Sequence, residues 1–271
     1  MSVSGAWAIV RSMTTQTELP DRPAEAPAVA VRASNATKHY GDSDSDADTL
    51  VRALGNIDID FNAGQFTSIM GPSGSGKSTL MHCLAGLDQL TSGHIWFGGT
   101  DLSTLSQQQL TDLRRDHIGF VFQAFNLIPT MTARENITLP LDLAGTKPDA
   151  EWFEIVVDSV GLADRLDHRP SELSGGQQQR VAVARAMVGK PDVIFADEPT
   201  GNLDSRTGKA ILSFLKNAVA EFGQTIIMVT HDPVAATYAD RVVFLQDGTI
   251  ENEILNPRVD QVLAAMNRLD G

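Results

Sequence analysis

The sequence predicts an α/β fold with a mostly parallel sheet, and three stretches of the chain support this. Residues 66–70 (FTSIM) form a strand-like run, which a glycine-rich loop joins to a helical run at residues 77–85. Residues 193–196 (VIFA) are too few for a helix and are typical of a strand buried on both faces of a parallel sheet. Residues 225–230 (TIIMVT) form a third apolar strand. Such strands, combined with helical runs, indicate the α/β class.

Length and composition agree with a globular protein and exclude several classes. A chain of 271 residues with 42% hydrophobic content can bury a core in one domain plus a small subdomain. No run of about 18 apolar residues occurs, and the first residues do not resemble a signal peptide, so we expect no membrane span. The net charge of −13 argues against a DNA-coating surface, and we expect no nucleic-acid partner. The one cysteine, Cys83, excludes an intrachain disulfide and suits a reducing compartment.

The start of the chain differs in composition from the rest. Residues 1–28 are rich in Ala, Thr, Pro and Ser without periodicity, which predicts a disordered tail. We expect one domain over residues 29–256 and a C-terminal extension over residues 257–271. Residues 41–48 (GDSDSDAD) resemble a calcium loop, but glycine at the sixth and glutamate at the twelfth loop position are missing. A solvated acidic loop is the better interpretation.

The glycine-rich loop, GPSGSGKS, matches the phosphate-loop pattern G-x-x-x-x-G-K-[ST]. Its glycines allow backbone N–H groups to point into one concavity, and the following helix adds its partial positive charge. Lys77 would reach the β- and γ-phosphates of a nucleotide, and the Ser78 hydroxyl would bind Mg²⁺. A plain turn before a helix is the alternative. The expected phosphate-binding residues are Gly71, Pro72, Ser73, Gly74, Ser75, Gly76, Lys77, Ser78 and Thr79.

An acidic pair follows the apolar run at residues 193–196. Asp197 would stand at the carboxyl end of a strand, where open α/β sheets place ligands, and would hold Mg²⁺ through water. Glu198 can polarise the attacking water as a general base. Taken alone, such a pair is more often an ordinary junction between strand and turn. The phosphate loop upstream favours the catalytic interpretation.

Residues 173–180 read LSGGQQQR and precede a helical run at residues 177–188. Glycines at a helix N-terminus allow close backbone approach to an anion, although an ordinary serine N-cap is the alternative. Together with the phosphate loop, LSGGQ resembles the signature of the ATP-hydrolysing subunit of ATP-binding-cassette (ABC) transporters. The resemblance implies a phosphate-loop NTPase fold with a mostly parallel core sheet, an antiparallel β subdomain and a helical subdomain at roughly residues 124–190.

The resemblance also implies how the protein works. Two copies would pair head to tail, with ATP held between the phosphate loop of one chain and the signature of the other. ATP and Mg²⁺ are the expected cofactors, and the reaction is hydrolysis of ATP to ADP and phosphate. The signature residues acting on the partner's nucleotide would be Ser174, Gly175, Gly176 and Gln177.

Four smaller motifs follow the order of the family. Tyr40 matches the aromatic residue that stacks on adenine, and His231 matches the histidine that reaches the γ-phosphate. Gln123 matches the glutamine that contacts Mg²⁺ and the attacking water. Glu198, His231 and Gln123 are therefore the expected catalytic residues. The expected Mg²⁺ ligands are Ser78, Gln123 and Asp197, and the loop that crosses the dimer interface is expected at Asn202, Leu203 and Asp204.

The apolar residues that follow Gln123 suggest a membrane partner. Phe125, Leu127 and Ile128 are more apolar than a loop normally is, and we interpret them as an exposed patch that couples to a permease. Packing beneath the helical subdomain is the alternative.

Residues 86–93, 122–136 and 196–205 resemble one subfamily, which contains lipoprotein-release, macrolide- or peptide-export and cell-division ABC ATPases. This implies a permease with a large extracytoplasmic domain and an ATPase on the cytoplasmic face of the membrane. The expected role is export or extraction of a lipoprotein, peptide or hydrophobic compound. Regulation of an extracytoplasmic cell-wall hydrolase is the alternative, and a soluble iron–sulfur-assembly ATPase is less favoured.

Overall fold

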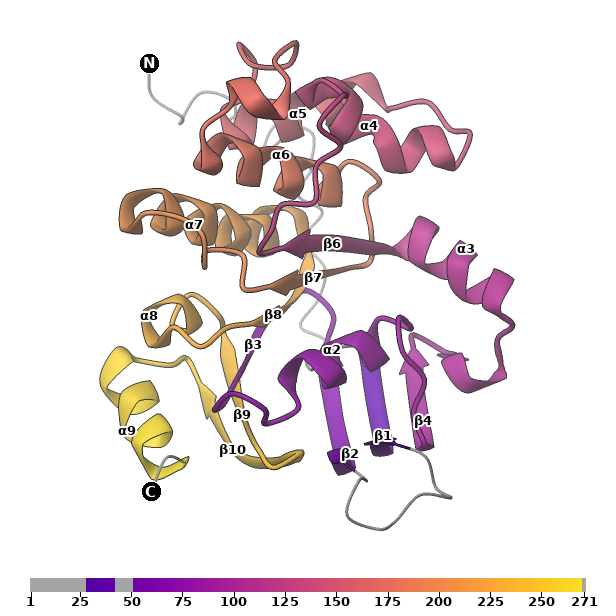
Figure 1. The fold of residues 1–271 in the computed structure, drawn as a ribbon, viewed down its shortest axis with the longest axis vertical. Coiled ribbons are helices and arrows are strands. Elements are labelled where there is room, and N and C mark those ends of the chain that lie inside the picture. Colours follow the sequence, from indigo (N-terminus) through magenta and orange to yellow (C-terminus); the bar gives the residue numbers. More distant parts are fainter. Residues whose placement is uncertain (1–27, 42–50, 270–271) are drawn as a thin grey trace, which may run out of the picture.

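The computed structural model describes residues 28–41 and 51–269, and the strands form two sheets (Figure 1). One is a four-stranded antiparallel sheet in the order β2-β1-β4-β5, and the other is a six-stranded sheet in the order β10-β9-β3-β8-β7-β6. Residues 1–27 of the predicted tail and residues 42–48 of the acidic loop lie outside the described residues.

The six-stranded sheet is parallel except for β10, which pairs with β9 in the antiparallel direction. A mostly parallel sheet is what the sequence predicts. Within it, Asp197 pairs with Phe122 on one side and with Val229 on the other. The residues that follow these three strands therefore emerge together at one edge of the sheet. The strands are β3 (Phe66–Met70), β6 (Ile118–Phe122), β7 (Val193–Asp197), β8 (Thr225–Val229), β9 (Arg241–Gln246) and β10 (Thr249–Leu255).

Continuous apolar runs are needed in these strands because both faces of the sheet are buried. Side chains alternate between the faces of a strand. In β7, Ile194 packs into one hydrophobic core, whereas Val193 and Phe195 pack into a second core on the opposite face. Met228 and Ile227 of β8 divide between the two cores in the same way. This burial is the physical reason for the pattern that predicted the α/β class.

The antiparallel sheet consists of β1 (Val29–Tyr40), β2 (Val51–Asn62), β4 (Ser92–Phe97) and β5 (Thr100–Asp101). Helix α2 (Lys77–Leu84) lies between this sheet and the six-stranded sheet. Its Leu80 and Leu84 share the second core with Phe61 of β2 and Ile95 of β4. The smaller sheet therefore covers the helix that follows the phosphate loop.

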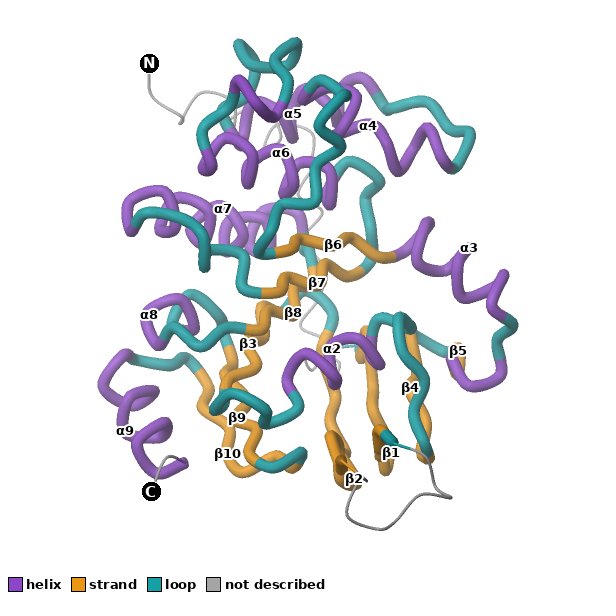
Figure 2. Tube along the Cα trace, in the orientation of Figure 1, coloured by secondary structure: helices purple, strands orange, loops and turns teal. Residues whose placement is uncertain are grey.

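Helices α4 (Ala133–Leu143), α5 (Ala150–Val160) and α6 (Gly175–Met187) form a group of their own, which contains no strands (Figure 2). Their buried side chains, such as Ile137 and Phe153, belong to the same hydrophobic core as Ile194 of β7. Helix α3 (Gln107–His117) leads into β6, and α7 (Ser205–Phe222) connects β7 to β8. The 3₁₀ segments are Leu102–Thr104 and Pro170–Glu172.

The end of the chain folds back onto the sheet. Helix α9 (Val259–Leu269) inserts Val262 and Ala265 into a small core with Phe244 of β9 and with Ala236 of the short helix α8 (Pro233–Ala236). Residues 259–269, which the sequence places in an extension, therefore pack against the main body. None of the helices within residues 28–41 and 51–269 is long and apolar enough to cross a membrane.

Candidate active site

The loop between β3 and α2 forms an open cradle of backbone N–H groups. The backbone φ values are 151° at Gly71, 81° at Gly74 and 97° at Gly76. Residues other than glycine rarely adopt such positive φ values. A Cβ on Gly71 would lie 2.0 Å from the carbonyl oxygen of Leu245, whereas one on Gly74 would meet no atom of the described chain within 4 Å. In the described structure no side chain caps the N-terminus of α2. The first turn of α2 therefore presents unsatisfied donors, which suit a phosphate.

Lys77 places a cation in the same cradle. Its Nζ donates hydrogen bonds to the carbonyl oxygens of Gly71, at 2.9 Å, and Pro72, at 2.7 Å. Burial lowers the pKa of Lys77, and the charges of Glu198 and Asp197 act in the opposite direction. The phosphate loop and the acidic pair, which are far apart in the sequence, thus meet electrostatically at the same edge of the sheet.

Asp197 is the last residue of β7 and lies in a partly desolvated position. Burial raises the pKa of its carboxyl group, and the neighbouring charge of Glu198 raises it further. The neighbouring side chains of His82 and Lys77 lower the pKa of Asp197, but they do not compensate for burial. A cation bound beside this carboxylate would stabilise its ionised form, which is the form that binds a metal.

Glu198 has an unusual backbone and a firmly held side chain. Its φ is 46°, in the left-handed region, and its N–H donates to the carbonyl oxygen of Val229 at 2.9 Å. One carboxylate oxygen contacts His231 Nδ1 at 2.8 Å, and the other accepts a hydrogen bond from the Thr230 hydroxyl at 3.3 Å. When Glu198 acts as a base its carboxylate is ionised and only accepts hydrogen bonds, and in that state Nδ1 of His231 is the donor. The ends of β7 and β8 together orient Glu198.

Gln123 is exposed and follows β6 at the same edge of the sheet. Its backbone carbonyl oxygen accepts a hydrogen bond from Asn202 Nδ2 at 2.9 Å. A Cβ on Gly201 would lie 2.7 Å from Gln123 Nε2 and would displace that side chain. Asp204 caps α7 through bonds from the N–H groups of Arg206 and Thr207. The loop at residues 201–204 is thus joined to Gln123.

The LSGGQ segment forms the capped N-terminus of α6. The Ser174 hydroxyl accepts a hydrogen bond from the N–H of Gln177, and the Gln177 side chain accepts one from the N–H of Ser174. The hydrogen of the Ser174 hydroxyl is not used by this cap and remains able to donate. A Cβ on Gly176 would lie 2.4 Å from Cγ2 of Thr207. Glycine there allows α6 to approach α7 closely.

One contact at the site has no counterpart in the sequence-based expectations. Gln179 is fully buried, and its Nε2 donates a hydrogen bond to the carbonyl oxygen of Pro199 at 2.6 Å. The residue after the acidic pair is thereby tied to the helix that follows LSGGQ. The only sequence signal was a third glutamine on an otherwise apolar helix face.

Tyr40 ends β1 and stands beside α2. Its hydroxyl donates a hydrogen bond to Asp88 at 2.7 Å, and it also interacts with the side chain of Thr79 in the first turn of α2. Burial raises the pKa of Tyr40, and the bond to Asp88 raises it as well. The residue expected to stack on adenine therefore adjoins the helix expected to hold the phosphates.

The expectation of an exposed patch at Phe125, Leu127 and Ile128 was wrong about exposure. All three side chains are half-buried, and Leu127 packs against the core of the helical group. Arg185 of α6 donates hydrogen bonds to the carbonyl oxygens of Phe125, at 2.8 Å, and Asn126, at 2.6 Å. These bonds tie the backbone of the segment to α6, a contact between distant residues that the linear sequence could not indicate.

Exposed apolar surface occurs nearby, in a groove between α3, β6 and α4. The groove has a volume of about 440 Å³. Leu143 at the end of α4 is 74% exposed there, and Leu87 is exposed as well. Its charged side chains are three arginines and Asp116, and Arg115 forms ion pairs with Asp116 and Asp112. The apolar side chains of the groove include Leu87, Phe120, Phe122, Leu139 and Leu143, and the arginines are Arg114, Arg115 and Arg185.

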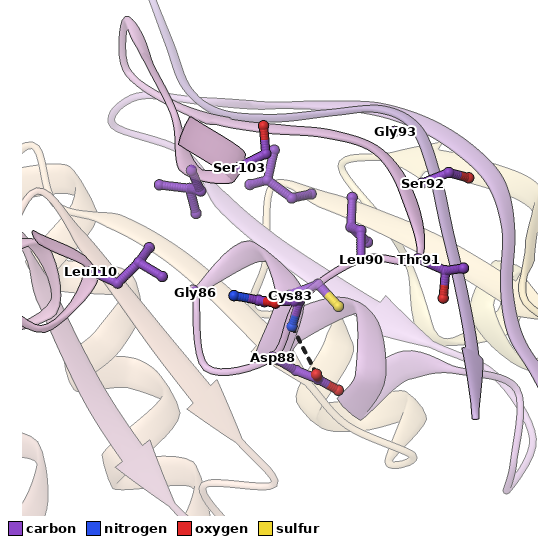
Figure 3. A pocket seen from close by; sticks show the side chains of 12 residues that line it. Cys83, Gly86, Asp88, Leu90, Thr91, Ser92, Gly93, Ser103 and Leu110 are labelled. Carbon is purple, nitrogen blue, oxygen red and sulfur yellow. Dashed lines mark hydrogen bonds between the residues drawn. The ribbon is translucent and has the colours of Figure 1, made fainter. Parts of the chain in front are cut away.

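A separate cavity of about 300 Å³ lies between the end of α2 and β4. Figure 3 shows Cys83 and Asp88 close together among the residues that line it. Burial raises the pKa of the Cys83 thiol to about 12, which makes this cysteine a poor nucleophile. Within the part of the chain that the structure describes, no three His, Cys, Asp or Glu side chains gather to form a metal site of their own.

Comparisons with known proteins identify relatives of the whole folded body. Residues 54–201 match the family model described as ABC transporter. The chain is 42% identical over 229 residues to MJ0796, an uncharacterized ABC transporter ATP-binding protein of Methanocaldococcus jannaschii, covering 82% of this chain and 96% of the relative. It is 42% identical over 226 residues to the bacitracin export ATP-binding protein BceA of Halalkalibacterium halodurans, covering 83% and 88% of the two chains.

Two further matches bear on assembly. The macrolide export ATP-binding/permease protein MacB of Marinobacter nauticus is 44% identical over 83% of this chain, which spans only 34% of that longer protein. A solved dimeric structure of MJ0796, described as a post-hydrolysis state bound to ADP and Pi, matches with a TM-score of 0.75 and 41% identity. That match covers 84% of this chain and 99% of the other.

Proposed function

The chain belongs to the ABC transporter family and is an ATP-binding, ATP-hydrolysing subunit of such a transporter, and we propose that its catalytic site is the edge of the sheet at which β3, β6, β7 and β8 end. One observation carries this proposal. The uncapped N-terminus of α2 with Lys77 lies at the same edge as the Glu198–His231 pair. An anion-binding cradle and an oriented general base are the two parts that hydrolysis of a phosphoanhydride requires.

In the proposed mechanism, the N–H groups of the loop and Lys77 bind the β- and γ-phosphates of ATP. Glu198 accepts the proton of the attacking water. His231 and Thr230, which hold both carboxylate oxygens, keep Glu198 aimed. When the water attacks the γ-phosphorus, the bond to the β–γ bridging oxygen breaks, and ADP leaves with the electron pair.

We propose that Mg²⁺ is held by Ser78, Gln123 and Asp197, and that it would neutralise charge on the phosphates. The donor set fits a hard cation, because it consists of a hydroxyl, an amide and a carboxylate oxygen. The burial that raises the pKa of Asp197 supports this assignment, since a cation beside the carboxylate would offset the cost of its ionisation.

We further propose that Ser174 acts on the nucleotide of a second copy. Figure 1 shows α2 beside the antiparallel sheet and α6 in the helical group. Because the two helices lie apart in one chain, a partner chain is the natural source of the second helix N-terminus at each phosphate. The dimeric assembly of MJ0796 supports a paired arrangement. The free hydrogen of the Ser174 hydroxyl and the nearby glycines suit a γ-phosphate.

The membrane partner is proposed to dock in the groove beside Leu87 and Leu143, with the ATPase on the cytoplasmic face. An amphipathic cytoplasmic helix would place its apolar face on the leucines and phenylalanines of the groove. Phe125, Leu127 and Ile128 would then support the groove from beneath. The ATP-binding/permease relative supports a permease partner.

For the transported molecule we propose a peptide or hydrophobic compound, in line with the bacitracin and macrolide exporters among the relatives. The corresponding permease would carry a large extracytoplasmic domain. A complex that regulates a cell-wall hydrolase through the same kind of permease is the second candidate. Restoration of bacitracin or macrolide resistance in a sensitive strain, by this chain with its permease, would separate the two.

The assignment of the base is tested by Glu198→Gln, which keeps the size of the side chain and removes the proton acceptor. Hydrolysis should fall by about a hundredfold or more, while ATP binding stays nearly unchanged. An ATP-bound dimer should then accumulate on gel filtration. Hydrolysis by Glu198→Gln at the wild-type rate would show that another group is the base.

A further inference from the structure

We propose that Lys38 and Asp88 are positioning residues that hold the ring of Tyr40 as a preset platform for the adenine base of ATP. The inference rests on the proposed role of Tyr40 in binding ATP and adds two residues to it. Neither Lys38 nor Asp88 belongs to the phosphate loop, the acidic pair or the signature. Both act on the nucleotide only through Tyr40.

The carboxylate of Asp88 connects the two other side chains. Its Oδ1 accepts a hydrogen bond from Lys38 Nζ at 2.7 Å, and its Oδ2 accepts one from the Tyr40 hydroxyl, also at 2.7 Å. The backbone N–H of Gln89 donates a further hydrogen bond to Oδ1 at 2.7 Å. Both oxygens of Asp88 are therefore engaged, and the carboxylate cannot turn without breaking a charge-assisted bond.

Lys38 restrains the ring from a second direction. Its Nζ lies 4.8 Å from the centroid of the Tyr40 ring, within the range of a cation–π contact. The Lys38 side chain is only 12% exposed, and its Nζ also donates to the carbonyl oxygen of Gln89 at 2.7 Å. Lys38 is thus fixed by two acceptors and covers one face of the ring.

Part of Tyr40 remains accessible to a ligand in the described structure. Although Asp88 holds its hydroxyl and Lys38 covers one face, Tyr40 is still 42% exposed. The hydroxyl also interacts with Thr79, in the first turn of the helix that would hold the phosphates. An adenine stacked on the exposed part of the ring would therefore lie close to the first turn of α2, which would hold its phosphates.

The charge states agree with this arrangement. Burial raises the pKa of Asp88, but the hydrogen bonds from Lys38 and Tyr40 outweigh that effect and lower it overall. Burial and the bond to Asp88 both raise the pKa of Tyr40. Near neutral pH an ionised Asp88 therefore accepts a hydrogen bond from a neutral phenol, and the platform persists across the physiological range.

The segment that carries Asp88 is itself anchored to β1. The N–H of His39 donates to the Thr91 hydroxyl at 2.9 Å, and the N–H of Thr91 donates to the carbonyl oxygen of Thr37 at 2.8 Å. Asp88 borders the cavity shown in Figure 3, so its position depends on these bonds more than on close packing from behind. A ring held before the ligand arrives loses less conformational entropy on binding.

The test compares ATP with ribose 5-triphosphate, which carries the phosphates without a base. In Asp88→Asn, which keeps the size of the side chain, we expect the KM for ATP to rise about fivefold with kcat within twofold, as expected for loss of charge-assisted bonds. The KM for ribose 5-triphosphate should not change. Tyr40→Phe, which keeps the ring and removes the hydroxyl, should show the same selectivity with a smaller effect.

Glu253→Gln is the matched control. Glu253 pairs with Arg241 through two hydrogen bonds, at 2.6 and 3.0 Å, in the β9–β10 hairpin. The substitution removes the negative charge of Glu253 and thereby a comparable ion pair elsewhere in the chain. Both KM values should remain at the wild-type level in this variant.

Tyr40→Ala separates the inference from the function on which it rests. If Tyr40 stacks on adenine, its loss should raise the KM for ATP about tenfold, the scale of base–aromatic stacking. An unchanged KM in Tyr40→Ala would refute the stacking role itself. A raised KM in Tyr40→Ala, with wild-type values in Asp88→Asn and Tyr40→Phe, would overturn only the positioning role. Equal increases for ATP and ribose 5-triphosphate in Asp88→Asn would also overturn it, because they indicate general disturbance. If Asp88→Asn does not fold, Tyr40→Phe alone decides.

Discussion

Asp197 and Glu198 are neighbours in the sequence but have different environments. Asp197 ends a buried strand, and burial raises the pKa of its carboxyl group. Glu198 itself has a left-handed backbone, and both of its carboxylate oxygens are held by side chains that follow β8. Two carboxylates with different surroundings can take different roles. This supports the proposal that Asp197 binds the metal and Glu198 accepts the proton.

The raised pKa of Asp197 has a consequence for stability that can be measured. The folded chain keeps the proton of Asp197 at a pH where the unfolded chain, with the ordinary pKa of 3.8, has lost it. The contribution of this group to the free energy of unfolding therefore falls as the pH rises above 3.8. Asp197→Asn should raise the melting temperature of the nucleotide-free chain at pH 7, and the gain should shrink toward pH 4.

Thermal melting of wild type and Asp197→Asn between about pH 4 and pH 8 checks this expectation. MgATP hydrolysis by the same variant should be strongly reduced if Asp197 holds the metal. A melting temperature below that of wild type at pH 7 would show that ionised Asp197 stabilises the nucleotide-free chain.

The two helices that begin in glycine-rich sequence have different N-termini. In the described structure no side chain caps α2, whereas Ser174 and Gln177 form a capping box on α6. The first arrangement leaves backbone donors for a ligand of the same chain. The second satisfies α6 internally and leaves a hydroxyl hydrogen and closely packed glycines for another molecule. The serine-cap interpretation and the signature interpretation of Ser174 are thus compatible.

Ser174→Asp separates these two roles because aspartate is also an effective N-cap. The melting temperature should stay near that of wild type, and ATP binding by the isolated chain should persist. Hydrolysis should be lost, since a negative charge would face the partner's γ-phosphate. Lys77→Ala should instead abolish nucleotide binding by the isolated chain.

Ser174→Arg provides the comparison without a cap acceptor, and it should add a stability loss of about 1 kcal/mol to the same catalytic defect. Equilibrium binding of ATP by the monomer, measured beside steady-state hydrolysis, decides the question. Equal loss of monomer binding in Ser174→Asp and Lys77→Ala would contradict a role in trans.

At the scale of the whole molecule, the six-stranded sheet separates two hydrophobic cores. One core continues into the helical group, and the other continues into α2 and the antiparallel sheet. Strands β6, β7 and β8 each contribute side chains to both cores. We therefore expect a displacement of the helical group to be transmitted to the ends of these strands, which carry the proposed catalytic residues. The groove beside Leu143 lies between α3 and α4, where a partner would contact both regions.

The docking proposal is tested with Leu143→Asp. Because this side chain is 74% exposed, the fold and the basal ATPase rate should remain unchanged. Association with the permease should fail, since a charge in a desolvated interface core is strongly unfavourable. Co-purification with the detergent-solubilised permease is the measurement. Leu255→Asp, at a side chain that is 66% exposed on β10, is the control and should bind normally.

Leu127→Asp should behave differently from Leu143→Asp. Leu127 packs against the core of the helical group, so a charge there should lower the melting temperature.

Normal co-purification of Leu143→Asp would rule out the groove as the docking surface.

The sequence by itself determined the local elements, the α/β class and the family. Strands β3, β7 and β8 were predicted within one residue of their observed bounds, because apolar runs are local signals. Glycines in fixed spacing likewise marked the phosphate loop and the signature. These motifs are readable because each needs only a short stretch of backbone.

Only the tertiary structure decided which distant residues meet. It placed His231 on Glu198, Gln179 on Pro199, and Lys38 and Tyr40 on Asp88, and it turned Leu127 inward. Each of these contacts joins parts of the chain that are far apart in the sequence, so it depends on strand order and on how the helices cover the sheet. A linear pattern records which side chains prefer burial, whereas the partner of each buried side chain is set by packing in three dimensions.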